Sequence, residues 1–307
     1  MKGYVFAMVL LCCLTAPAVA FSAAEEGAPA VVVSIKPIHS LVAAVMEGVG
    51  EPRLLVKGSS SPHSYALRPS DARAIAGAQL VVWVGEELES FLEKPLAALG
   101  GGAVRLKLTD ALKEHLLPVR SGGAWEEHGH DEKHGAPDPH FWLDPARAAS
   151  FVDLLVPLLG RIDPAHSQRY RDNGERLKER LDSLRENLQR KVEPVKEVPY
   201  VVFHDAYRYF EQAYGLDAVG SITIGPERRP GARRIFEVRE KIKALNARCV
   251  FSEPQFEPRL VATVIEGTGA EKGVLDPLGA GLPAGPETYF LLMNALADNL
   301  VACLERQ

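Results

Sequence analysis

The sequence predicts an α/β fold of two lobes, each built on a mostly parallel sheet, joined by a long rigid helix. Short apolar runs alternate with helical patterns in both halves of the chain, as in repeated βα units. A charged segment with a single apolar stripe separates the halves. The composition agrees, because 307 residues with 47% hydrophobic and 24% charged side chains can bury the cores of two ordinary domains.

Residues 1–20 have the features of an export signal that is removed from the mature protein. Lys2 precedes an apolar run over residues 4–14, and Ala18 and Ala20 form a small-x-small cleavage motif. We expect cleavage after Ala20 and an exported, soluble protein, because the run is shorter than the roughly 20 residues that span a bilayer. The segment holds one lysine and no acid, so its loss changes the formal charge from −5 to −6. A mildly acidic chain argues against nucleic acid as a partner.

Residues 21–160 are expected to form the N-terminal lobe. Strands are predicted at residues 31–35, 53–56, 80–84 and 104–106, where β-branched or aliphatic residues are bounded by Gly, Pro or Ser. Helical patterns lie between them at residues 40–47, 70–76 and 87–98. This order predicts a parallel sheet with helical crossovers.

Residues 161–194 are predicted to form the helix that joins the lobes. Asp163 can cap the first free amides, Pro164 suits the first helical turn, and Pro194 ends the run. A single apolar stripe runs along this charged helix, formed by Leu177, Leu181, Leu184, Leu188 and Val192. About 30 residues at about 1.5 Å each span about 45 Å. A coiled-coil dimerisation helix is the alternative, but the stripe is short for one, so we expect a monomer whose helix packs on its own lobes.

Residues 195–307 are expected to form the C-terminal lobe, which repeats the order of the first. Strands are predicted at residues 200–203, 218–222, 249–252 and 273–275, and helices at 205–214, 232–246, 258–267 and 287–303. Of the four cysteines only Cys249 and Cys303 lie outside the signal segment. An even pair in an exported chain predicts a disulfide, worth roughly 4 kcal/mol in the chain-entropy model. Two free buried thiols are the alternative.

Four side chains that can bind a metal follow predicted strands. His204 ends the strand in YVVFH, Asp276 follows the strand in GVLDPLG, and His63 lies in the loop KGSSSPHSYALRPSD. His140 lies in DPHFWLDP, where prolines and aromatic residues predict a stiff, partly buried loop. Loops at the carboxyl ends of parallel strands converge on one crevice, so we expect these side chains to meet there. Three imidazoles and one carboxylate are a normal tetrahedral set for zinc, although a single histidine is more often a hydrogen-bonded structural residue.

The segment at residues 126–136, EEHGHDEKHGA, adds the histidines His128, His130 and His134. Its glycines and high charge predict a mobile loop. Two of its histidines have the spacing of the His-Glu-x-x-His metalloprotease motif, but that motif requires a buried helix, and the glycines argue against one. We expect an accessory loop that binds metal weakly and exchanges it quickly, with an inert solvated loop as the alternative.

Several motifs resemble those of a known family: SIKPIHSLV, SPHSYALRPSDAR, LVVWVGEELE, DPHFWLDP, YVVFHDAYRYFEQAYGL, CVFSEPQF and LDPLG. In this order, over nearly the whole mature chain, they resemble the zinc-binding periplasmic components of ABC-type metal-uptake transporters, whose two lobes are joined by a rigid helix. The resemblance implies capture of Zn(II) in the periplasm and delivery to a membrane ABC permease. It also implies metal ligation by His63, His140 and His204, with Asp276 as a carboxylate that ligates directly or yields to water.

Two alternatives to a zinc carrier stay open. Relatives that carry manganese typically have a glutamate where this chain has His204, so a manganese or iron carrier is the nearer alternative and zinc is favoured. A secreted zinc hydrolase with Glu253 as its base is the alternative from another class, but a fourth protein ligand would take the place of the catalytic water. We therefore expect a binding protein that is not an enzyme, with a periplasmic zinc chaperone as a second candidate partner.

The chain departs from the family pattern at one position beside the predicted site. The family often has an acidic residue before the first histidine, where this chain has Pro62, so no ligand can come from that side chain. His39 follows the first strand, and we expect it to lie behind the ligands or on the surface.

Overall fold

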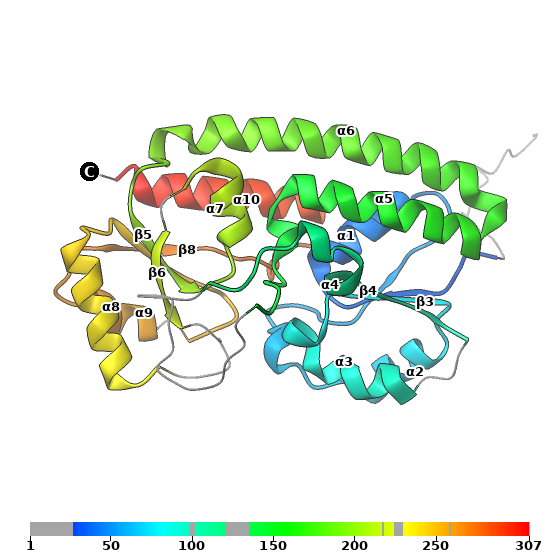
Figure 1. Ribbon diagram of the computed structural model, residues 1–307, viewed down its shortest axis with the longest axis horizontal. Coiled ribbons are helices and arrows are strands. Elements are labelled where there is room, and N and C mark those ends of the chain that lie inside the picture. The colour runs from blue at the N-terminus through cyan, green and yellow to red at the C-terminus, as the bar shows by residue number, and fades with distance from the viewer. Residues whose placement is uncertain are drawn as a thin grey trace, which may run out of the picture.

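The structure is a computed structural model that describes residues 27–98, 102–120, 135–216, 218–223, 230–257 and 259–306. The predicted signal segment and the histidines of the accessory loop, His128, His130 and His134, lie outside these residues. Two parallel sheets form the framework, one in each half of the chain (Figure 1). They confirm the predicted fold class.

The strands of each sheet follow the order of repeated βα units. The N-terminal sheet has the order β2-β1-β3-β4, with β1 (Val31–Val33), β2 (Arg53–Leu54), β3 (Leu80–Trp83) and β4 (Val104–Lys107). The C-terminal sheet has the order β6-β5-β7-β8, with β5 (Tyr200–His204), β6 (Ala218–Thr223), β7 (Cys249–Ser252) and β8 (Glu271–Val274). The inner strands β1, β3, β5 and β7 are buried along their whole length, as expected where helices cover both faces of a parallel sheet.

The described α-helices cover the sheets and join the lobes. They are α1 (Lys36–Val45), α2 (Pro69–Ala76), α3 (Glu86–Ala98), α4 (Leu108–Ala111), α5 (Pro145–Ile162), α6 (Ser167–Val192), α7 (Arg208–Tyr214), α8 (Ala232–Ala244), α9 (Arg259–Ile265) and α10 (Thr288–Leu304). α1 begins before its predicted start, because Pro37 fits a first helical turn. α5 is not among the predicted helices, although Asp144 caps it by accepting the N–H of Ala146 and Pro145 occupies its first position.

The helix α6 lies across both lobes, along the top of the molecule in Figure 1. Its 26 residues extend for about 39 Å at about 1.5 Å per residue. The predicted stripe is buried, at Leu177, Leu181, Leu184, Leu188 and Val192. It contacts α1, α5 and α10 of the same chain, so this face of α6 is not free to form a coiled coil.

Cys249 and Cys303 form the predicted disulfide, which joins β7 to α10. Both cysteines are buried. Because α10 also contacts α1 and α6, the bond ties the C-terminal sheet to a helix that reaches the other lobe. The predicted segment boundaries at residues 160 and 194 stay a prediction. In space, α10 from the C-terminal segment also contacts α1 of the N-terminal segment.

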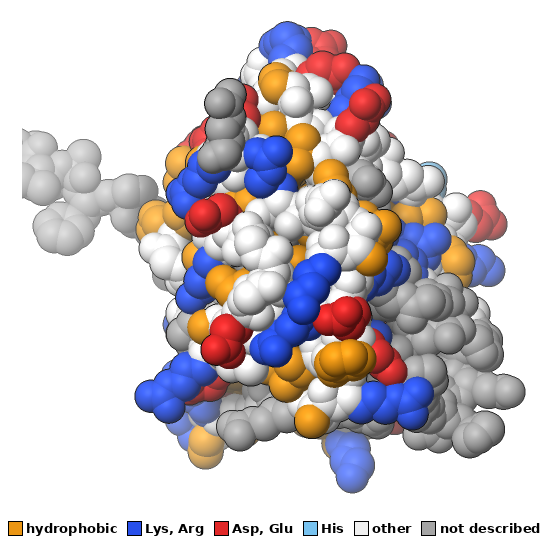
Figure 2. Space-filling view, turned by 90° about the vertical axis from the view of Figure 1, so that its left-hand side faces the viewer, with side chains coloured by type: hydrophobic (Ala, Val, Ile, Leu, Met, Phe, Trp, Pro, Cys, Tyr) orange, Lys and Arg blue, Asp and Glu red, His pale blue; other side chains and the backbone are white. Residues whose placement is uncertain are grey.

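The length and apolarity of the helices and the distribution of surface charge are features that set apart membrane-spanning and strongly charged proteins. No helix of the described chain is long and apolar enough to cross a membrane. At the end of the molecule formed by the C-terminal lobe, basic and acidic side chains lie close together (Figure 2). Among the described residues of this face, charges of the two signs are therefore interspersed.

Candidate metal centre

Three histidines meet between the two halves of the chain, and a different element places each one. His63 lies in the short 3-10 turn Pro62–Ser64, His140 precedes the 3-10 turn Phe141–Leu143, and His204 is the last residue of β5. One ring nitrogen of each lies within 4.8 Å of the others. The side chains of His140 and His204 are buried, and that of His63 is half-buried.

The two buried rings face each other through their Nε2 atoms, which are 3.4 Å apart. Two nitrogens bound at about 2.0–2.1 Å to a tetrahedral zinc ion are separated by about 3.4 Å. The ring of His63 completes the group, with its centroid 5.9 Å from that of His140 and 5.7 Å from that of His204. The rings therefore already have the spacing of three ligands around one small ion.

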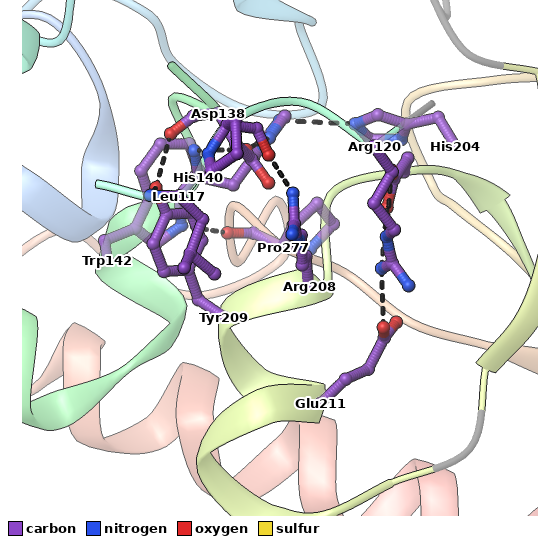
Figure 3. A network of polar contacts seen from close by, with 12 residues as sticks. Leu117, Arg120, Asp138, His140, Trp142, His204, Arg208, Tyr209, Glu211 and Pro277 are labelled. Atoms are coloured by element: carbon purple, nitrogen blue, oxygen red, sulfur yellow. Dashed lines mark hydrogen bonds and ion pairs between the residues drawn. The ribbon is translucent and has the colours of Figure 1, made fainter. Parts of the chain in front are cut away.

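A carboxylate orients each of the buried rings. Asp138 Oδ1 lies 2.8 Å from Nδ1 of His140 and also accepts the backbone N–H of His140 at 3.0 Å (Figure 3). Glu253 Oε1 lies 2.6 Å from Nδ1 of His204. A carboxylate at Nδ1 keeps the proton on that nitrogen and leaves the lone pair of Nε2 for a metal.

The pKa values of the three rings differ. Burial lowers the pKa of His63 and His140 well below the ordinary value, and the neighbouring imidazoles add to this effect. Both rings are therefore neutral at pH 7, as a metal requires of its ligands. Burial acts to lower the pKa of His204, but the carboxylates of Glu253, Asp205 and Asp138, with Glu253 first, together outweigh burial and raise that pKa above the ordinary value. A cation that binds His204 thus competes with a proton.

Asp276 lies in the loop after β8 but is outside the three-histidine group. Its carboxylate accepts the backbone N–H groups of Leu278 at 3.1 Å, Gly279 at 3.0 Å and Ala280 at 2.5 Å. It also accepts Nε2 of Gln255 at 2.8 Å. The side chain is therefore held by its own loop, beside Leu278, which lines the metal centre.

The space between the rings is small and has apolar walls. Leu88 and Trp142 line it from the N-terminal half, and Phe256 and Leu278 from the C-terminal half. The cavity volume is about 10 Å³, close to the room that one water molecule needs. A single ion or water molecule fits between the rings.

The other two side chains considered for the site are held by different groups. His39 is buried in α1, with its Nε2 2.8 Å from the backbone oxygen of Pro52. Glu253 lines the space between the rings, and its Oε1 lies 2.6 Å from Nδ1 of His204. This contact gives Glu253 a role in orienting the ring, whereas the hydrolase alternative requires it to act as a base on a water.

Sequence reasoning missed the carboxylate partners of the rings. Asp138 lies two residues before His140 in APDPH, and this proximity is the signal that could have found it. Glu253 directly follows β7, the strand beside β5 in the sheet. Its contact with His204 requires the lateral order of the strands, which the sequence pattern does not contain.

Comparison with known proteins gives a consistent result. The family model described as "Zinc-uptake complex component A periplasmic" matches residues 31–303. The chain is 45% identical over 306 residues to the high-affinity zinc uptake system protein ZnuA of Brucella suis, which covers 90% of this chain and 92% of that protein. It is 35% identical over 290 residues to the protein of the same name from Yersinia pestis, with 90% and 91% covered. The fold is similar to that of the periplasmic zinc binding protein TroA from Treponema pallidum, with a TM-score of 0.78, 21% identity and coverage of 91% and 100%.

Proposed function

This chain belongs to the family of periplasmic zinc-uptake complex components, and we propose that it captures Zn(II) between its lobes and delivers it to a membrane ABC permease. The observation that carries the proposal is the meeting of His63, His140 and His204 around one small space. The 3.4 Å between the facing Nε2 atoms supports a tetrahedral ion at this point.

The donor atoms favour zinc over manganese. Neutral imidazole suits zinc, copper or nickel, whereas manganese prefers oxygen donors. The fourth coordination position is left to Asp276 or to a water molecule. Among its described contacts, Oδ2 of Asp276 accepts one N–H, from Ala280, so this oxygen retains a lone pair for an ion. The carboxylate has to move toward the rings to use it.

In this proposal the protein is a carrier and not an enzyme. The cavity of about 10 Å³ suits one ion, and Oε1 of Glu253 is held by Nδ1 of His204. The mature protein acts in the periplasm after cleavage behind Ala20. The apolar stripe of α6 packs within its own chain, which supports a monomer. The segment with His128, His130 and His134 is proposed as a weak accessory metal site, where a periplasmic zinc chaperone is a candidate partner.

The test is a chelator competition with metal-stripped protein and the His204→Ala variant. We expect a zinc affinity that falls at least about tenfold in the variant, because zinc loses one of its few protein ligands. His115→Ala is the matched control, since His115 is an exposed histidine away from the rings and its loss should leave the affinity unchanged. An unchanged affinity in His204→Ala would contradict the proposed site.

Parallel titrations with Mn(II) separate zinc from the nearer alternative. A zinc carrier should bind Mn(II) far more weakly than Zn(II) at this nitrogen-rich centre. Preference for Mn(II) in the wild-type protein would instead support the manganese carrier.

A further inference from the structure

Two short antiparallel segments lie beside the metal centre, and we call them the arms. They are residues 117–120 and 135–138. The N–H of Asp138 donates to the carbonyl of Leu117 at 2.8 Å, and a second backbone bond closes the ladder further along. Because the second arm ends at Asp138, which orients the ring of His140, the position of the arms bears directly on a proposed ligand.

Residues of helix α7, in the other lobe, form hydrogen bonds with both arms (Figure 3). The hydroxyl of Tyr209 donates to the carbonyl of Asp138 at 2.7 Å and accepts the N–H of Leu117 at 2.9 Å. The guanidinium of Arg208 donates to the carbonyl of Pro118. The arms are therefore fixed to the C-terminal lobe, although they belong to the N-terminal half of the sequence.

Arg120, at the end of the first arm, makes the charged part of this contact. Its Nε donates to both oxygens of Asp205 at 3.0 and 3.1 Å, and its Nη2 lies 2.5 Å from Oε2 of Glu211. The side chains of Asp205 and Glu211 are only 7% and 6% exposed. Asp205 directly follows His204, so the guanidinium of one half holds the side chain of the residue next to a proposed ligand of the other half.

We propose that Arg120 is a positioning residue, which holds His204 of one lobe against His140 of the other and thereby slows the release of the metal. This inference rests on the proposed function, since it concerns the same centre. Without the guanidinium, the buried oxygens of Asp205 and Glu211 lose the donor that they share, which is costly for buried polar groups. The turn after β5 then moves away from the arms, and the 3.4 Å spacing of the facing Nε2 atoms is lost.

The test compares zinc dissociation from loaded wild-type protein, Arg120→Gln and Arg120→Lys after mixing with excess chelator. Loss of one partner in a buried charged contact acts mainly on dissociation, so Arg120→Gln should release zinc about tenfold faster or more. Arg120→Lys should lie between this variant and the wild type, because an ammonium keeps the charge but not the planar fork that binds both oxygens of Asp205. The absorption spectrum of bound Co(II) should change in both variants, since it reports the arrangement of the ligands.

Arg180→Gln is the matched control. Arg180 donates to both oxygens of Glu287 at 2.9 and 2.7 Å, in an exposed pair that contacts none of the ligands, so its loss should leave the rate and the spectrum unchanged. Where Arg120→Gln does not fold, as judged by thermal unfolding, Arg120→Lys carries the test.

Wild-type dissociation rates and Co(II) spectra in the folded Arg120 variants would overturn the proposal, even if their melting temperatures fall. A wild-type protein that does not retain zinc would instead contradict the proposed function. The two failures are therefore distinguishable.

Discussion

The hydrogen bonds at Nδ1 decide what the two buried histidines can do. With Asp138 and Glu253 as acceptors, the rings of His140 and His204 present their Nε2 lone pairs to each other and to an ion between them. The two carboxylates have different effects on the protonation of the rings. His140 has a pKa far below the ordinary value, whereas Glu253 raises that of His204. In the proposed site, a metal therefore meets a neutral ring at His140 and competes with a proton at His204.

Replacement of Glu253 by glutamine should change both the affinity for zinc and its dependence on pH. In the wild type, the raised pKa of His204 means that protons begin to displace zinc while the pH is still above about 6.5. In Glu253→Gln, burial is left as the main influence and lowers this pKa, so the loss of affinity should move to lower pH. At pH 8 the variant should bind about 10- to 100-fold more weakly, because the ring has lost its orienting carboxylate. Chelator competition between pH 5.5 and 8 measures both effects, and an unshifted pH profile would show that Glu253 does not control the proton on His204.

The residues of the site could be predicted to different degrees. His63 and His204 could be placed near one crevice because His204 ends and His63 follows a strand of a parallel sheet, where ligands bind beyond the carboxyl ends. His140 could be placed there because prolines and aromatic residues predict a stiff loop around it. The orientation of Asp276 could not be predicted, because three backbone N–H groups of its own loop donate to the carboxylate. Such contacts depend on local backbone geometry, which hydrophobic periodicity does not describe.

At the scale of elements, α6 shows why a long charged helix is stable in this chain. Its stripe is buried against α1, α5 and α10, so tertiary packing stabilises a helix whose other faces are polar. The stripe could be predicted because its period of 3.6 is visible without knowledge of the partner. The helix α5 was missed because its first residues also belong to another feature. Its capping residues Asp144 and Pro145 are part of the motif DPHFWLDP, which predicts a stiff loop around His140.

Truncation of the stripe at Leu181 should destabilise the metal-free protein. Leu181 is 1% exposed, so Leu181→Ala leaves a cavity and should lower the free energy of unfolding by about 2–5 kcal/mol. Leu291→Ala on α10 is the control, because that side chain is 47% exposed and its loss should change the stability by less than about 0.5 kcal/mol. Urea unfolding of the three proteins gives the comparison. Equal midpoints would mean that the stripe contributes little to stability.

At the scale of the whole molecule, the two lobes share the largest buried apolar cluster of the described residues, and each lobe also has a smaller cluster of its own. A single cluster of buried apolar residues includes Val33 of the N-terminal sheet, Leu181 of α6 and Phe251 of the C-terminal sheet. Polar contacts cross the same boundary. Lys36 Nζ donates to the carbonyls of Gly279, Ala280 and Leu282 at 2.6, 3.0 and 2.9 Å, and Trp142 Nε1 donates to that of Pro277 at 2.8 Å. The lobes are therefore not independent domains joined by a flexible linker.

A shared core predicts that the metal-free protein unfolds in one cooperative transition. The tryptophans all precede α6 in the chain, at Trp83, Trp125 and Trp142, so their fluorescence reports on the N-terminal half and, through Trp142, on its contact with Pro277. Far-UV circular dichroism reports on the helices of both halves. The urea midpoints from the two signals should coincide, and separate midpoints would show that the core does not couple the lobes.

Zinc should raise the urea midpoints of fluorescence and circular dichroism by the same amount, because its proposed ligands come from both halves. At a free zinc concentration 100 times the dissociation constant, an ion that binds only the folded state adds about 2.7 kcal/mol of stability. If zinc instead shifted the fluorescence midpoint alone, His204 and the rest of the C-terminal half would not take part in binding. The unfolding curves therefore test the shared core in the metal-free protein and the bridging role of the ion in the loaded one.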